Sequence, residues 1–238
     1  EGNIAGVMSV ILMKEARFGI NGNVGANVKP FNKVTSQITG SIDYSMGKAT
    51  FYLTALNIYQ ALDIGQSNEA VFTAIDSTVS LSGAGGIKVT MSTVNSGFDY
   101  YINDKNSLSL NVSYKPITQD VDLLGETFLY KAESPLNRIA SLTFNGYTSD
   151  ETSASLFYKK TFKNPVQELT VENTYYNFRS VEDNSFDNTR YPYDSGTVLD
   201  TYSRQEESLN RRNYYSAKVN FVQPLWMNAK LESGYQVY

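Results

Sequence analysis

The chain has 238 residues and a formal net charge of −4, so it has no basic field for nucleic acid and we expect no nucleic-acid partner. It contains neither Cys nor His, which excludes serine and cysteine triads, thiolate chemistry and imidazole ligands for zinc. No paired carboxylates or metal ligands occur at an informative spacing, so we expect a protein that is not an enzyme, without cofactor or metal.

No stretch approaches the roughly 20 apolar residues that a membrane helix requires, and the most apolar one, Val7–Met13, is far too short. The residues EGNIAGVMSVILMK at the start read as a small-residue lead-in followed by a strand that is apolar on both faces. An ordinary core strand is an alternative for this segment. No signal peptide opens the chain, and we interpret it as a mature chain or a fragment.

Strict alternation of apolar and polar residues begins at Phe18, with Ile20 and Val24 on one face and Asn21 and Asn23 on the other. A period of two predicts β-strands with one apolar and one polar face. Two further strands are predicted over residues 34–44 and 49–60, on either side of a short turn at residues 46–48. A long irregular segment is then predicted from Ala61 to about Gly86, and its glycines do not have the spacing of a phosphate-binding loop.

The segment Ser96–Pro116, SGFDYYINDKNSLSLNVSYKP, predicts a complete hairpin of two strands of about ten residues around a polar turn. Such hairpins are the units of outer-membrane barrels, although a soluble hairpin can have the same pattern. In the membrane interpretation, lipid contacts one face and the barrel lumen the other. The expected lipid-facing residues are Leu108, Leu110 and Val112, and the expected lumen-facing residues are Ser109 and Asn111.

Two more long segments are predicted as loops, Pro116 to about Glu151 and Arg179 to about Arg212. The first contains a strand-like piece at residues 139–147, which either extends a barrel strand beyond the membrane or pairs within the loop. The second is rich in Asp, but the spacing fails the calcium-loop pattern and favours a solvated loop. Strands are predicted around these loops at residues 152–162, 168–178, 213–222 and 230–238.

Short turns recur about every 60 residues, near residues 47, 105, 165 and 226, and the long segments lie between them. Outer-membrane barrels have this asymmetry of short periplasmic turns and long extracellular loops. Aromatic residues also gather on the short-turn side, as in an interfacial girdle, with core packing of a soluble sheet as the alternative. They are Tyr44, Phe51, Tyr100, Tyr101, Phe162, Phe221 and Trp226.

Counting from Phe18 gives nine strands, whereas bacterial single-chain barrels close with an even number. The predicted fold class is therefore an all-β, antiparallel transmembrane β-barrel that is partial, with about nine strands of a larger barrel. The last strand points toward the long-loop side. Tyr238 thus lies at the end opposite to the one where the terminal aromatic residue of many outer-membrane proteins is found.

The opening EGNIAGVMSVILMK resembles the end of the plug and the beginning of the barrel in TonB-dependent receptor-like proteins of the Bacteroidota type. Their usual pattern is Gly-Val/Ile-x-Asn-Ile-x-Leu-Lys, from which this chain departs at Ser9 and Met13. GFDYYINDKNSLSLNVSY, LFYKKTF, QELTVENTYY and FVQPLWMNAKLESGY are similar to successive barrel segments of that family. The resemblance implies a barrel of about 22 strands, filled by an N-terminal plug and driven by an energy-coupling inner-membrane complex.

On this basis residues 1–17 are expected to end the plug domain, and residues 18–238 to form the N-terminal part of the barrel. The expected function is uptake of an unknown nutrient across the bacterial outer membrane, with membrane lipid and the coupling complex as partners. The alternatives are a non-transporting, adhesin-like surface barrel and a soluble β-sheet carbohydrate-binding protein. Loop aromatics that can stack on a sugar or peptide are the candidate binding residues: Tyr191, Tyr193 and Tyr202.

Overall fold

The computed structural model describes residues 17–31, 33–226 and 229–238, and within them nine β-strands follow one another along the chain. The lead-in and the predicted plug residues 1–16 lie outside the described residues. One short 3-10 turn, η1 (Thr73–Ile75), connects the third and fourth strands. The strands are β1 (Arg17–Phe31), β2 (Lys33–Gly47), β3 (Ala49–Phe72), β4 (Ser77–Asn103), β5 (Asn106–Lys131), β6 (Ser134–Thr161), β7 (Glu168–Pro192), β8 (Asp200–Pro224) and β9 (Lys230–Val237).

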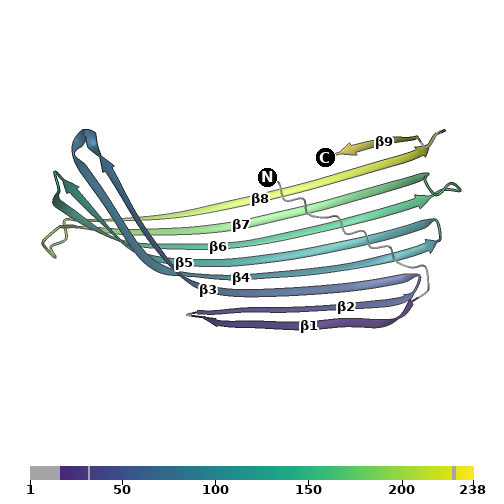
Figure 1. Cartoon of the computed structure of the whole chain (residues 1–238), viewed down its shortest axis with the longest axis horizontal. Helices are drawn as coiled ribbons and strands as arrows, with labels where there is room; N and C mark the ends of the chain where they lie inside the picture. Colours follow the sequence, from purple (N-terminus) through teal and green to yellow (C-terminus); the bar gives the residue numbers. More distant parts are fainter. Residues whose placement is uncertain (1–16, 32, 227–228) are drawn as a thin grey trace.

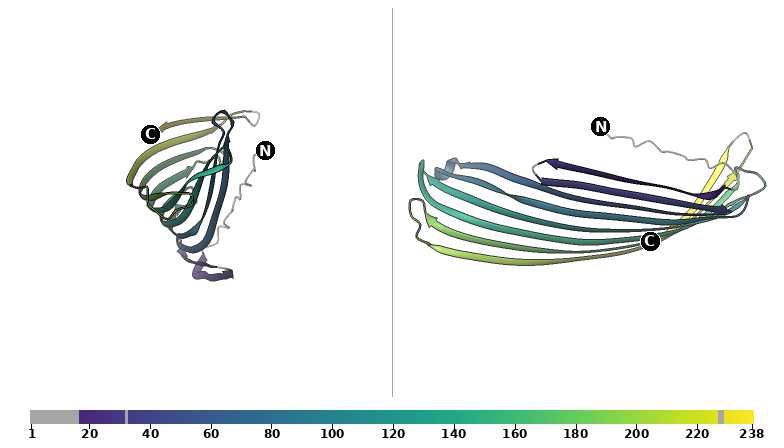
Figure 2. Two further views of the ribbon diagram at one scale, coloured as in Figure 1. Left: turned by 90° about the vertical axis from the view of Figure 1, so that its left-hand side faces the viewer. Right: turned by 90° about the horizontal axis from the view of Figure 1, so that it is seen from below.

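All nine strands form a single antiparallel sheet whose order is the order of the sequence, β1 to β9 (Figure 1). Seen along the strands, the sheet bends into a trough (Figure 2, left). Among the described residues β1 pairs only with β2 and β9 only with β8, so the trough is open along one side. The all-β antiparallel class and the nine strands predicted from the sequence are confirmed. No helix in the described part of the chain is long and apolar enough to cross a membrane.

Four short turns lie at one end of the sheet, which we call the lower end, and connect β2–β3, β4–β5, β6–β7 and β8–β9. They coincide with the turns predicted near residues 47, 105, 165 and 226. At the first, Gly47 has a φ of 60°, a left-handed conformation that glycine adopts without steric cost. At the second, the Asn103 side chain accepts hydrogen bonds from the Lys105 amide (2.9 Å) and from Asn106 Nδ2 (2.7 Å), as in an Asx turn.

The prediction of three long loops at the other, upper end is wrong. The segments Ala61–Gly86, Pro116–Glu151 and Arg179–Arg212 are mostly strand, because β3 to β8 continue for 24 to 28 residues and reverse in short upper turns (Figure 2, right). The piece at residues 139–147 pairs in register with residues 119–127 of β5, so it extends a barrel strand. The two ends therefore differ because the strands β3 to β8 extend farther at the upper end, and not because long loops connect them there.

The glycine-rich sequence SGAGG, which predicts a flexible loop, lies within β4. Its glycines allow the close approach of a neighbouring backbone: a Cβ at Gly85 would lie 1.9 Å from the Asp122 carbonyl oxygen of β5. A Cβ at Gly83 would lie 3.1 Å from the Leu124 carbonyl oxygen. Any side chain at Gly85 would push β5 away, so this glycine serves strand packing.

Residues directly opposite each other on paired strands share a face of the sheet, so the register defines the two faces. Near the lower end one face is apolar. Leu110 of β5 lies between Phe98 of β4 and Leu156 of β6, and Leu110 and Leu156 are each 41% exposed. This apolar face is called the outward face, and the opposite face the inward face. The next outward row toward the lower end contains Phe18, Met46, Tyr100, Leu108, Tyr158, Val171, Val219 and Tyr235.

On β5 the apolar outward residues begin at Leu108 and end at Tyr114, six residues higher, or about 20 Å along the strand, and on β7 and β8 they end at Tyr175 and Tyr215. This height is comparable with the apolar belt of about 25 Å on transmembrane barrels. We call these rows the membrane band. The predicted division of the hairpin is confirmed geometrically, since Leu108, Leu110 and Val112 lie on the outward face and Ser109 and Asn111 on the inward face.

Aromatic residues lie at both margins of the membrane band. Of those predicted for the lower girdle, Tyr44, Phe51, Tyr100 and Phe221 are on the outward face, while Tyr101 has inward register. An upper group, absent from the sequence-based prediction, consists of outward Tyr114, Tyr175 and Tyr215. Aromatic rings at two heights are typical of proteins that cross a bilayer.

Above the membrane band the two faces exchange character over β3 to β5. Outward positions become polar or charged there, including Asp120 and Asp122 of β5. Inward positions become apolar, as at Met91 of β4 between Ile58 of β3 and Ile117 of β5. The outward face has fewer apolar residues where it no longer contacts hydrocarbon. Because apolar and polar residues no longer alternate in the same way there, these parts of the strands were not predicted from the sequence.

Candidate binding surfaces above the membrane band

Two of the three tyrosines predicted as binding residues lie in one aromatic cluster at the upper end. The Tyr193 ring centroid lies 6.1 Å from that of Phe128 and 6.4 Å from that of Tyr130. The Arg138 guanidinium lies over the Tyr191 ring, 4.9 Å from its centroid. We call these five residues the tip cluster. Their register places the strand residues of the cluster on the outward face.

The third tyrosine, Tyr202, does not join the tip cluster. It lies on β8 opposite Asn188, has inward register, and exposes 60% of its surface. Sequence reasoning also missed Phe128, Tyr130 and Arg138, because they fell in a predicted loop. Phe128 and Tyr130 are aromatic residues two positions apart, as on one face of a strand, and this spacing was a weak signal that the strand continues there.

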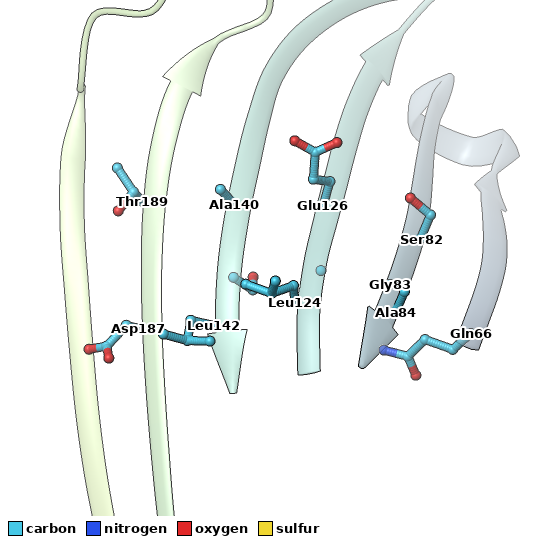
Figure 3. A pocket seen from close by; sticks show the side chains of 12 residues that line it. Gln66, Ser82, Gly83, Ala84, Leu124, Glu126, Ala140, Leu142, Asp187 and Thr189 are labelled. Atoms are coloured by element: carbon cyan, nitrogen blue, oxygen red, sulfur yellow. The ribbon is translucent and has the colours of Figure 1, made fainter. Parts of the chain in front are cut away.

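A shallow hollow of about 740 Å³ lies beside the tip cluster, over β3 to β7 (Figure 3). Glu126 belongs to its lining and forms an ion pair of 3.5 Å with Arg138, so the hollow and the cluster are continuous. The Arg138 Nε atom is buried and has no hydrogen-bond partner among the described residues. The side chains around the hollow are mixed in character and include Ser82, Ala84, Leu124, Ala140, Leu142, Asp187 and Thr189.

Within the membrane band the inward face is polar and crossed by side-chain hydrogen bonds. The Tyr52 hydroxyl of β3 passes over Gly97 of β4 and donates to Asn111 Oδ1 of β5. Ser109 Oγ donates to Asp99 Oδ1 over 2.5 Å. These bonds satisfy polar groups across three neighbouring strands, as expected of a lumen wall.

A charged network continues this wall near the upper margin of the band. Lys115 Nζ of β5 forms an ion pair of 2.8 Å with Glu151 Oε1 of β6. The Tyr176 hydroxyl of β7 donates to Glu151 Oε2 over 3.4 Å. Glu151 therefore connects three strands on the inward face.

Above the band the inward face divides into two halves with different chemistry. On β3 to β5 it is aliphatic, around Ile58, Met91 and Ile117. On β6 and β7 it is polar: Asn145 Nδ2 donates to Glu182 Oε1 over 3.0 Å and also to Asn184 Oδ1. A molecule that contacts both halves would need an apolar and a polar side. Among the described residues, no group of three or more acidic side chains could hold a metal ion.

Residues 160–238 match the model of the Outer membrane protein beta-barrel family. The antiparallel sheet also carries an apolar outward band between two groups of aromatic rings. This match and the band together identify the cellular location of the protein. The protein resides in the bacterial outer membrane. The match covers the last third of the chain, from the end of β6 through β9.

A search of the curated proteins found no match. Among solved structures, the siderophore receptor PiuA from Acinetobacter baumannii is 10% identical with a TM-score of 0.16, and the alignment covers 87% of this chain and 48% of that one. The chain thus spans about half the length of that receptor. OpdQ from Pseudomonas aeruginosa is 8% identical with a TM-score of 0.13, over 92% of this chain and 96% of that one. At such TM-scores these likenesses carry no argument.

Proposed function

We propose that this outer-membrane protein is part of an uptake receptor whose upper end faces the cell exterior. The observation that supports this proposal is the inward face, which is polar within the membrane band and half apolar above it. A passive aqueous pore needs a polar lining throughout, whereas a binding vestibule combines apolar contact with a few fixed polar groups. The vestibule is the inward surface around Met91 and Glu182.

Energy coupling and an N-terminal plug are part of the same proposal, and they rest on the resemblance to TonB-dependent receptor-like proteins. The open trough supports the association with further barrel strands, since exposed backbone groups at a sheet edge are costly in hydrocarbon. The substrate class that fits the two halves of the vestibule is an amphiphilic nutrient, such as a peptide or a glycan with an apolar face.

One observation favours a second candidate function, a surface-binding barrel. The tip cluster has outward register, away from the vestibule, and Tyr193 is 46% exposed. Aromatic rings beside an arginine suit contact with a sugar or protein on the cell exterior. In that case the tip cluster and not the vestibule would carry binding.

The experiment compares strains with and without the intact gene on a panel of single nutrients. Deletion is expected to abolish growth on a subset, and an uncoupler of the proton gradient is expected to stop uptake of the same nutrients. Met91→Asp places a charge in the vestibule and should reduce that uptake, whereas the control Thr90→Asp, on the outward face of the same strand, should not.

Uptake that persists with the uncoupler would indicate a passive pore and contradict the receptor. Normal growth of the deletion strain on every nutrient, together with loss of cell adhesion by the Tyr193→Ala variant, would favour the surface-binding candidate. Surface amounts of each variant are compared by antibody labelling of whole cells, so that a loss of uptake is separated from a loss of assembly.

A further inference from the structure

Two arginines lie side by side on the outward face just above the membrane band. Arg179 of β7 is directly opposite Arg211 of β8, and both side chains are exposed. Like charges directly opposite on paired strands are destabilising unless something neutralises them. Neither guanidinium forms a hydrogen bond or an ion pair with another residue that the structure describes.

The nearest acidic side chain does not neutralise the pair. Asp150 of β6 is opposite Arg179 in the register, but its Oδ1 accepts a hydrogen bond of 2.7 Å from the Tyr114 hydroxyl. No ion pair joins Asp150 to either arginine among the described residues. One carboxylate would in any case leave a positive charge in this row.

The height of the pair is defined by the rows beneath it. Tyr175 and Tyr215 are directly opposite each other four residues lower, at the upper margin of the membrane band. Between them and the arginines, Asn177 Nδ2 donates to Asn213 Oδ1 over 2.6 Å. Aromatic rings lie where hydrocarbon meets headgroups, so the next polar rows reach the layer of lipid phosphates.

We propose that Arg179 and Arg211 bind a phosphate group of lipid A in the outer leaflet. Two adjacent guanidinium groups offer parallel N–H donors that match the oxygens of a phosphate, and binding would remove the repulsion between them. Long arginine side chains at this height can also extend toward the headgroups. The site goes beyond the proposed uptake function and depends only on which leaflet the upper end enters.

The test uses the intact full-length protein, purified and delipidated in detergent, and counts bound lipid by native mass spectrometry. Diphosphoryl lipid A is expected to bind the wild-type protein, and the double variant Arg179→Gln, Arg211→Gln should bind it about tenfold or more weakly. The double lysine variant keeps the charge but loses the bidentate geometry and should lie between them. The control Arg212→Gln removes the same charge from the inward face of β8 and should leave binding unchanged.

Four results would overturn the proposal. Equal binding of dephosphorylated lipid A would exclude the phosphate as the recognised group, and equal binding of phosphatidylglycerol would exclude lipid A as its source. Displacement of lipid A by millimolar inorganic phosphate would indicate a simple anion site. Heat-modifiable mobility on gels confirms that each variant is folded, and unchanged lipid A binding by a folded double glutamine variant would also refute the site.

Discussion

At the residue scale, the two faces of the membrane band predict unequal losses of stability for substitutions at adjacent residues of β5. Arg in place of Leu110, on the outward face near the middle of the band, should destabilise the assembled barrel by about 2 to 4 kcal/mol. Arg in place of Asn111, on the inward polar face, should cost much less because the lumen is hydrated. Urea unfolding of the intact barrel in lipid vesicles measures both, and similar losses for the two variants would contradict the assignment of faces.

A second prediction at the residue scale concerns the substitution of Gly97, because the Tyr52 side chain occupies the space above this glycine. A Cβ at this position would lie 2.0 Å from Tyr52 Cζ, so Gly97→Ala must displace the ring and its hydrogen bond to Asn111. The expected cost is about 1 to 3 kcal/mol in the free energy of unfolding. In a Tyr52→Ala background the same change should cost little, and additive effects in this double-mutant cycle would refute the packing.

At the scale of elements, the sequence predicted strands well wherever one face meets lipid. The hairpin around Lys105 matches in register, turn and facing because lipid on one side and water on the other impose a period of two. Above the band that constraint ends, and residues such as Asp120, Asp122 and Gly85 lie in strands held by backbone pairing. Pairing partners distant in sequence cannot be inferred from composition, so the upper halves of β3 to β8 read as loops.

The same cause limited the prediction of binding residues. Tyr191 and Tyr193 could be chosen as exposed aromatics, but their partners Phe128 and Arg138 come from other strands of the sheet. The separation of Tyr202 from them follows from its inward register on β8, which a loop assignment does not define. The composition indicated that aromatic side chains were the candidates, but only the register of the strands showed which of these side chains are in contact.

The next prediction concerns which ends of the strands are accessible from outside the cell. A single Cys in place of Asp194, in the upper β7–β8 turn, should react with a membrane-impermeant thiol reagent on intact cells. A single Cys in place of Lys105, in the lower β4–β5 turn, should react only after the outer membrane is permeabilised. The chain has no Cys of its own, so labelling is unambiguous. Labelling of both positions on intact cells would show that the proposed orientation is wrong.

At the scale of the whole molecule, the open trough predicts that these 238 residues made alone do not close. Along β1, and along β8 above its pairing with β9, backbone groups have no partner strand among the described residues. Each unsatisfied group in hydrocarbon costs several kcal/mol, so the isolated chain should aggregate or insert only with added strands. The readout is refolding in lipid vesicles, and a heat-modifiable, protease-resistant monomer would disprove the expectation.

The strictly sequential order of the strands also has a consequence for how the wall is made. Among the described residues each strand from β2 to β9 pairs with the strand that precedes it in the chain, so these pairings join only segments that are neighbours in the sequence. Pairing can begin at a tight lower turn, where Tyr101 meets Ser107, and proceed upward until Ser77 meets Lys131. Closing a short loop has a low entropic cost, and each new pair shortens the loop to the next. Assembly should therefore proceed hairpin by hairpin, with the membrane band of each hairpin formed before its upper extension.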